Sequence, residues 1–362
     1  MSTTRIHYQD RWAVVTGASS GLGRGLAVRL AERGMSLVLT GRDAARLDQS
    51  AQQIRLVAPR VKVEMVATDL STRSGVSALL GHVGDRPIEV LVNNAGFGSY
   101  GPFAEADSDR EADEVALDVS AVITLARAFL PGMLARGSGG ILNVASTIAF
   151  QPAPYQAVYG ASKAFVLSFS QALWAEARAA GVSVTALCPG PTRTGFVEAL
   201  GAADAAHTAI YRRLADPEPV IEAGLQALEK GRAVVIPGAR NKLLAMSGRF
   251  MPPEWLTRVS ARLLRPSRQG LPDPVHHWAY RLDVIESKSG VDLRSRSERL
   301  LWRESPGVER SIGRSRHSDA LSALAEERFA FCIERESSEE FGDAVARGRL
   351  TSRGGVRPGL VE

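Results

Sequence analysis

Residues 12–23 read Trp-Ala-Val-Val-Thr-Gly-Ala-Ser-Ser-Gly-Leu-Gly, and this stretch decides the fold. Its first five residues are mostly apolar and β-branched, which indicates a short buried strand. Leu22, Leu26 and Leu30 then recur at helical spacing, and Gly34 ends that helix. A strand, a glycine turn and a helix are the context that a phosphate-binding loop requires. The alternative is a glycine-rich turn that binds nothing.

The turn has the spacing Thr-Gly-x-x-x-Gly-x-Gly, and each glycine has a distinct predicted role. Gly17 permits the tight turn, Gly21 lets backbone amides approach a pyrophosphate, and Gly23 allows close packing of the helix on the strand. The helix N-terminus adds partial positive charge for phosphate groups. The loop residues that we expect to bind a cofactor are Gly17, Ser19, Ser20, Gly21, Leu22 and Gly23.

Strand-like and helix-like segments alternate after this loop, with no internal repeat. Further strands are predicted at residues 36–40, 62–67, 88–92, 139–145 and 182–187. Helices are predicted at 44–57, around 111–127 with a continuation to Pro131, and at 155–180. This alternation predicts an α/β fold, a Rossmann-like doubly wound parallel sheet with helices on both faces.

The carboxyl ends of the strands carry residues suited to a dinucleotide. Arg42 can bind a ribose 2′-phosphate where an acidic residue would bind a free hydroxyl, so NADP(H) is favoured over NAD(H); an exposed helix-start arginine is the alternative. Asp69 either accepts a hydrogen bond from the adenine amino group or caps the next helix. The other expected contacts are Leu70, Asn93, Ala95, Gly96, Pro189, Gly190, Thr192 and Thr194.

Residues 146–163 hold the candidate catalytic groups. Tyr159 and Lys163 are four residues apart, so they share one face of a helix, and Ser146 precedes Tyr159 by thirteen residues. A hydroxyl, a phenol and an ammonium that converge can polarise a carbonyl group and pass it a proton. Most Tyr-x-x-x-Lys pairs are ordinary helix surface, but the upstream phosphate loop favours a catalytic role here.

The composition is typical of a globular protein, with 45% hydrophobic and 23% charged residues. The net charge of +5 comes without a basic block or interleaved aromatic residues, so no nucleic acid partner is expected. Two cysteines make no disulfide framework, and we find no metal-ligand pattern. We therefore expect no metal. Since there is no signal-peptide core and no long apolar run, we also expect a cytoplasmic protein without a transmembrane segment.

Charge density and apolar periodicity divide the chain in two. We expect a catalytic domain at residues 1–268 and a charged extension at residues 269–362 that is poorly ordered or partly helical. Its one amphipathic stretch is Ser318–Val345. The extension is either an interaction segment or sequence without a selected function.

Five motifs in this order resemble the short-chain dehydrogenase/reductase family. They are Thr16-Gly17-x-x-x-Gly21-x-Gly23, Asn93-Asn94-Ala95-Gly96, Ser146, Tyr159-x-x-x-Lys163 and Pro189-Gly190. The resemblance covers roughly residues 11–266, and residues 232–244 look like a bacterial branch of loosely characterised NADP-dependent reductases.

The resemblance implies NADP(H)-dependent hydride transfer to or from a small-molecule carbonyl or secondary alcohol. Tyr159 would be the general acid/base, Ser146 would bind the substrate oxygen, and Lys163 would bind the nicotinamide ribose and lower the pKa of Tyr159. It also implies a homo-oligomer, a dimer or a tetramer. The alternative is a catalytically silent Rossmann-fold nucleotide-sensing or scaffold protein. Several aromatic residues are expected near the site by motif order, namely Phe97, Tyr100, Phe150, Tyr155 and Phe196. We therefore expect a mainly apolar pocket.

Lowering the pKa of Tyr159 from about 10 to about 7 requires roughly 4 kcal/mol. One ammonium at about 5 Å, in an effective dielectric of about 20, supplies about 3 kcal/mol. An oxidised nicotinamide or a proton relay could supply the remainder.

Asp118 stands where the resembling family often has an asparagine that helps to hold a relay water. Its carboxylate accepts hydrogen bonds but donates none, and its charge would raise the pKa of Tyr159. The alternative is an aspartate that only solvates a helix surface. We expect Asp118→Asn to leave activity equal or higher.

Overall fold

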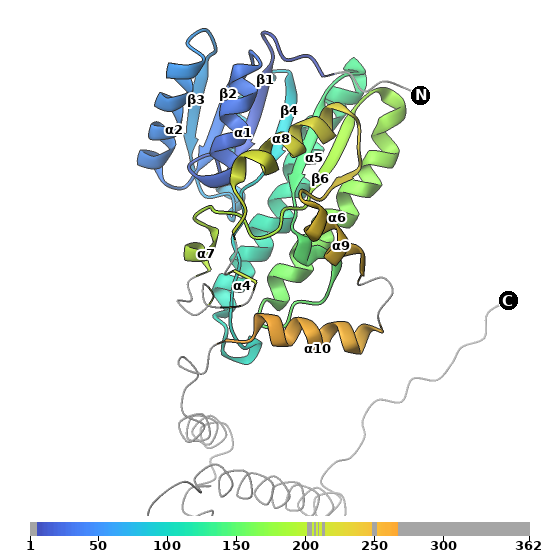
Figure 1. The fold of residues 1–362 in the computed structure, drawn as a ribbon. Coiled ribbons are helices and arrows are strands. Elements are labelled where there is room, and N and C mark those ends of the chain that lie inside the picture. The colour runs from blue at the N-terminus through green and yellow to red at the C-terminus, as the bar shows by residue number, and fades with distance from the viewer. Residues whose placement is uncertain are drawn as a thin grey trace, which may run out of the picture. The chain divides into compact units, whose positions relative to one another are not determined.

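The computed structural model describes residues 6–200, 205, 208, 210–211, 214–247 and 252–266. Seven strands in this part of the chain pair in parallel in one sheet of order β3-β2-β1-β4-β5-β6-β7 (Figure 1). The strands are β1 (Trp12–Thr16), β2 (Ser36–Gly41), β3 (Val63–Ala67), β4 (Ile88–Asn93), β5 (Gly140–Val144), β6 (Ser183–Leu187) and β7 (Val234–Val235). The predicted doubly wound sheet is confirmed, and each predicted strand ends within one residue of expectation. The edge strand β7 was not predicted.

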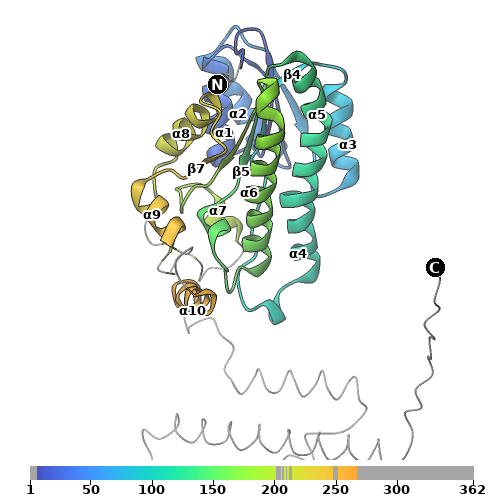
Figure 2. The same ribbon diagram turned by 90° about the vertical axis from the view of Figure 1, so that its right-hand side faces the viewer.

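Helices cover both faces of the sheet, as Figures 1 and 2 show. Ala13 and Val15 of β1 pack in one core and Val14 packs in the other, because successive side chains point to opposite faces. The strands are therefore apolar on both sides, as parallel strands under two helical layers must be. One face carries α1 (Gly21–Glu32), α2 (Ala44–Val57) and α8 (Pro217–Glu229), and the other carries α3 (Arg73–Val83), α5 (Val122–Arg136) and α6 (Ala157–Ala177).

The strand order reverses at β1, which pairs with β2 on one side and with β4 on the other. Connections on the two sides of this point run in opposite directions, so a crevice opens beyond the carboxyl ends of β1 and β4. The sheet thus places the glycine turn opposite the loop that follows β4.

The helix predicted around residues 111–127, with its continuation to Pro131, is a few residues longer at each end and irregular. It comprises α4 (Ser108–Val115), a π-helical turn (Ala116–Ala121) and α5, which continues past Pro131 to Arg136. By length and composition this run could cross a membrane. Its Leu125, Phe129 and Met133 instead pack in the core against the sheet.

The cap of α3 differs from the prediction. Thr72, rather than Asp69, is the N-cap, and its hydroxyl accepts a hydrogen bond from the Gly75 amide at 3.0 Å. Asp69 lies three residues too early and instead accepts a hydrogen bond from the Ser71 amide at 2.9 Å. Its carboxylate therefore remains beside the crevice.

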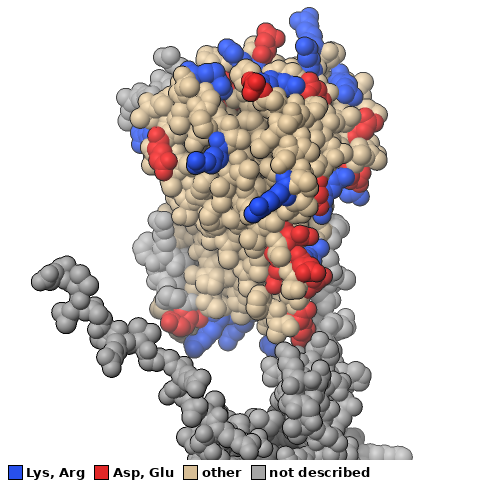
Figure 3. Space-filling model, turned by 180° about the vertical axis from the view of Figure 1, so that it is seen from behind, with Lys and Arg blue, Asp and Glu red and all other residues tan. Residues whose placement is uncertain are grey.

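The C-terminal part of the described chain forms α9 (Ala239–Ser247) and α10 (Pro253–Leu264). The predicted extension at residues 269–362, with its helix near Ser318–Val345, lies outside the described residues. On the face shown in Figure 3, lysines and arginines are scattered among acidic and uncharged residues and do not form one positive surface.

Replacing Leu91 tests the core. Leu91 is fully buried in the central strand β4, and Leu91→Ala should lower the free energy of unfolding by about 2–5 kcal/mol because it leaves a cavity. Leu56→Ala is the control, since Leu56 is 83% exposed and should change stability by about 0.5 kcal/mol or less. Equal effects in chemical denaturation would contradict this packing.

Candidate active site

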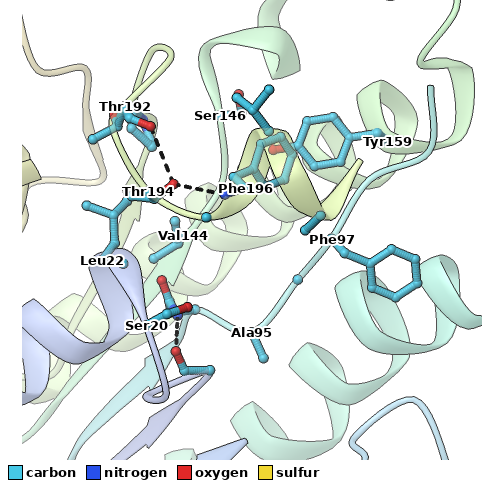
Figure 4. A pocket seen from close by; sticks show the side chains of 18 of the residues that line it. Ser20, Leu22, Ala95, Phe97, Val144, Ser146, Tyr159, Thr192, Thr194 and Phe196 are labelled. Atoms are coloured by element: carbon cyan, nitrogen blue, oxygen red, sulfur yellow. Dashed lines mark hydrogen bonds between the residues drawn. The ribbon is translucent and has the colours of Figure 1, made fainter. Parts of the chain in front are cut away.

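A cavity of about 580 Å³ lies at the carboxyl ends of β1, β4, β5 and β6 (Figure 4). It brings together the glycine turn, the loop after β4, the start of α6 and the loop after β6. The predicted site residues that line it are Gly17, Ser19, Ser20, Gly21, Leu22, Arg42, Asp69, Leu70, Ala95, Gly96, Ser146, Tyr159, Lys163, Pro189, Gly190, Thr192 and Thr194. Gly23, Asn93 and Asp118 do not line it.

The glycine turn has the geometry of a phosphate cradle. Gly17 and Gly21 adopt positive φ angles of 63° and 53°, which favour glycine. A Cβ on Gly23 would lie 2.2 Å from the Gly17 carbonyl oxygen, so Gly23 is needed for packing behind the turn. The Ser20 side chain does not cap α1, which leaves the helix N-terminus for an anion. These residues therefore fit a dinucleotide pyrophosphate.

Thr16 ties the glycine turn to the loop after β4. Its hydroxyl accepts hydrogen bonds from the Asn94 and Ala95 amides, both at 2.9 Å, and the Asn94 side chain donates to the Thr16 and Gly17 carbonyls. Asn94 lines the cavity and was missed as a site residue. Its position directly after the strand, within the quoted motif, was the available signal.

Asn93, which was expected to contact the cofactor, does not line the cavity. Asn93 is still part of β4 and is buried, and its amide donates to the Asn143 side chain in β5 at 2.9 Å. Asn143 in turn donates to Ser170 of α6 at 2.9 Å. Asn93 therefore joins adjacent strands beneath the cavity.

The other end of the cavity is lined by Arg42, Arg46 and Ser19. Arg42 has a 65% exposed side chain and lies 4.0 Å from the Asp69 carboxylate. Arg46 lies 3.4 Å from Asp43. Both guanidinium groups can reach an added phosphate, because neither is held in a buried contact.

The loop after β6 packs against the glycine turn. A Cβ on Gly21 would lie 3.0 Å from Thr194 Cβ, so this glycine also admits the loop. The Thr194 hydroxyl donates to the Thr192 carbonyl and accepts from the Phe196 amide, both at 3.4 Å (Figure 4). This turn holds Phe196 over the cavity.

Ser146 and Tyr159 face each other in Figure 4. Ser146 caps a short 3-10 helix, accepting from the Ile148 amide at 3.3 Å. The Tyr159 ring is buried and packs on Phe196, with ring centroids 5.1 Å apart. A carbonyl oxygen placed between the hydroxyl and the phenol would meet two donors.

Lys163 pairs with Asp118 beside this site. Its Nζ lies 2.8 Å from Asp118 Oδ2, donates to the Val144 carbonyl at 3.3 Å, and lies 5.6 Å from the Tyr159 ring centroid. Asp118 Oδ1 accepts from the Phe97 amide at 3.2 Å. Asp118 is buried within the π-helical turn, a feature frequent at functional sites, and it does not solvate a helix surface.

Burial raises the pKa of Tyr159 well above its usual value, and Tyr211 and Asp118 raise it further, while Ser146 opposes them. The lowering of this pKa that was expected from Lys163 does not prevail in the protein without cofactor, where the pKa of Tyr159 is raised and Asp118 pairs with the ammonium. The predicted opposing effect of Asp118 is present. Burial also raises the pKa of Asp118, and Lys163 opposes that shift. Tyr159 is thus held as a protonated phenol.

The substrate end of the cavity is mainly apolar. Phe97 and Phe196 line it as predicted, but Tyr100, Phe150 and Tyr155 do not. The apolar residues that line this end and were not predicted include Ile148, Val197 and Ile210.

Two buried polar residues near the site were also missed. Tyr211 lines the cavity and donates to Gln156 Oε1 at 3.1 Å. Glu114 is fully buried one helical turn before Asp118. Glu114 shares a helix face with the apolar residues Leu117, Ala121 and Leu125. An acid in such an apolar row was the available sequence signal for it.

Comparison with known proteins agrees with this architecture. A family model for short chain dehydrogenase matches residues 11–205. An uncharacterized oxidoreductase of Staphylococcus saprophyticus is 37% identical over 229 residues, which cover 62% of this chain and 94% of the relative.

Two solved structures show different cofactors on this fold. A short-chain dehydrogenase from Sphingobium yanoikuyae in complex with NADPH matches with a TM-score of 0.59 and 30% identity, over 73% of this chain and 99% of that one. A short-chain dehydrogenase/reductase from Burkholderia phymatum in complex with NAD matches with a TM-score of 0.61 and 26% identity, over 69% and 98%.

The protonation of Tyr159 can be measured directly. We expect the ultraviolet difference between the cofactor-free wild type and Tyr159→Phe to show no phenolate signal up to about pH 10, the usual tyrosine value. Burial and the Asp118 charge both favour the neutral phenol. A phenolate band that appears between about pH 7 and 8 in the wild type alone would contradict this assignment.

Proposed function

This chain belongs to the short-chain dehydrogenase/reductase family, and we propose that it is an NADP(H)-dependent reductase of ketones with mainly apolar substituents. The observation that carries this proposal is the convergence of Ser146, Tyr159 and Lys163 at one end of a cavity whose other end is a phosphate cradle. A silent nucleotide-binding protein would not need a buried, protonated phenol facing a second hydroxyl.

In the proposed reaction the nicotinamide supplies a hydride to the carbonyl carbon. Ser146 hydrogen-bonds the carbonyl oxygen and positions it, and Tyr159 donates its phenolic proton to that oxygen as negative charge develops there. The raised pKa of Tyr159 keeps this proton in place at neutral pH. The protein without cofactor is thus prepared for reduction, whereas oxidation would need the phenolate.

Lys163 has two tasks in this proposal. Its Nζ is within reach of the cavity and would hold the ribose hydroxyls of the nicotinamide half, and its charge would stabilise the phenolate that remains after reduction. The ion pair with Asp118 holds the ammonium at 2.8 Å, so this proposal replaces the expectation that Asp118→Asn leaves activity equal or higher with an expected loss of activity. This pair holds the lysine side chain in position before substrate arrives.

The preference for NADP(H) rests on Arg42, supported by Arg46 and Ser19 at the same end of the cavity. A guanidinium can bind a 2′-phosphate through two charge-assisted hydrogen bonds. Asp69 lies 4.0 Å from Arg42 and also borders this end, so it would orient the arginine.

Replacing Tyr159 tests the chemistry. Tyr159→Phe should lower kcat for reduction at least about a hundredfold, because a positioned general acid contributes 10²–10⁴-fold. Tyr211→Phe is the matched control, since Tyr211 also lines the cavity but donates to Gln156. Consumption of NADPH with a panel of ketones is the measurement. Equal rates for wild type and Tyr159→Phe would exclude the proposed mechanism.

Replacing Arg42 tests the cofactor. Arg42→Ala should weaken NADPH binding by about 1.5–3 kcal/mol, roughly 10–150-fold, and leave NADH binding nearly unchanged. Fluorescence titration with both cofactors measures this, with Arg55→Ala on the exposed side of α2 as control. A preference for NADPH that survives in Arg42→Ala but not in Arg46→Ala would assign the phosphate to Arg46.

A further inference from the structure

Glu114 is a buried acid that none of the steps above uses. Its side chain is fully buried in α4, and its Oε2 lies 2.5 Å from the hydroxyl of half-buried Ser99. Its Oε1 has no hydrogen-bond partner among the described residues. A buried polar atom without a partner costs about 1–3 kcal/mol. The folded protein would therefore be more stable with an apolar residue at position 114 than with glutamate.

Glu114 begins a row of polar groups that leads to the reacting phenol. It precedes Asp118 by four residues, so both carboxylates lie on the same side of the helix. Asp118 contacts Lys163 at 2.8 Å, and Lys163 lies beside Tyr159. The row runs from Ser99 near solvent to the interior of the site.

The charges in this row do not balance when every group is ionised. Glu114 and Asp118 would carry two negative charges against the one positive charge of Lys163, and burial penalises the uncompensated charge. The direct contact with Lys163 and the Phe97 amide favour the anionic form of Asp118. Glu114 is thus the group that holds a proton.

The pKa of Glu114 is set by its burial and by the charged and polar groups around it. The pKa of Glu114 is raised to about 7, mainly by burial and also by Asp118 on the π-helical turn, while Ser99 and Lys163 oppose the shift. Glu114 in turn raises the pKa of Tyr159 on α6. Its carboxyl is therefore protonated below neutral pH and ionised above it.

We propose that Glu114 supplies the proton that restores Tyr159 after each reduction, with Asp118 and Lys163 as the intermediate carriers. This inference rests on the proposed reductase function. After Tyr159 has given its proton to the product oxygen, its phenolate takes one from Lys163 through a bridging water. Lys163 is reprotonated by Asp118, and Asp118 takes a proton from Glu114 through a second water, since no hydrogen bond joins the two carboxylates directly. Glu114 takes a proton from solvent through Ser99. Each turnover thus takes up one solvent proton.

Glu114→Gln separates this role from a structural one, because the amide keeps the shape but cannot pass on a proton. In stopped-flow reduction with NADPH and the ketone that the wild type reduces fastest, the first turnover uses the proton already on Tyr159. Its rate constant should stay within about twofold of wild type, while kcat falls about tenfold as the relay is lost. The wild-type decline of kcat above about pH 7, where Glu114 ionises, should disappear.

Asp113→Asn is the matched control, since Asp113 is an exposed acid next to Glu114 on α4. It should leave the first turnover, kcat and the pH profile unchanged. A wild-type kcat and pH profile in Glu114→Gln would overturn the proposal. So would an equal fall of the first-turnover rate constant and kcat, which would indicate a structural role.

An infrared measurement tests the proton on Glu114 without turnover. The wild type at pH 6 should show a carboxylic acid C=O band that is lost on raising the pH to 9, absent in Glu114→Gln and retained in Asp113→Asn. The same pH-dependent band in Glu114→Gln as in wild type would overturn the proposal. If the wild type reduces none of the ketones, the proposed reductase function fails, and this band still decides the protonation of Glu114.

Discussion

The ion pair between Lys163 and Asp118 is the constraint around which the site is built. Both groups are buried, and removing one partner of a buried pair typically costs about 3–5 kcal/mol because the other charge is left unpaired. Keeping the pair in place requires the Val144 carbonyl at the end of β5, the Phe97 amide after β4, and a helix that brings Asp118 inward. The sheet, the loop and both central helices therefore meet at one ammonium group.

The fold and the cofactor end of the site could be predicted because their residues act locally. Gly17 and Gly21 take up backbone angles that other residues avoid, and the strand and helix on either side follow from apolar spacing. Tyr159 and Lys163 share a helix face by spacing alone. Such features are encoded within a few neighbouring residues, so a single sequence is enough to find them.

Features that depend on contacts between distant segments could not be predicted. Whether Asn93 or Asn94 faces the cavity depends on where β4 ends, and the strand includes Asn93. The π-helical turn shifts the register of the helix and buries Asp118, where a surface position was the alternative. The raised pKa of Tyr159 was not predicted, because it follows mainly from burial of the ring and then from Tyr211 and Asp118, which come from distant segments.

In the proposed reductase, a protonated Tyr159 beside the Lys163–Asp118 pair supplies the proton for reduction. The pH dependence of the first turnover in the wild type, followed as loss of reduced nicotinamide in a stopped-flow instrument, tests it most directly. Because the phenol keeps its proton, the rate constant should be flat from about pH 6 to about pH 9, below the ordinary tyrosine pKa of about 10. A rate constant that falls about tenfold per pH unit above about pH 7 would mean that the acid ionises near neutrality, and would contradict a Tyr159 that stays protonated.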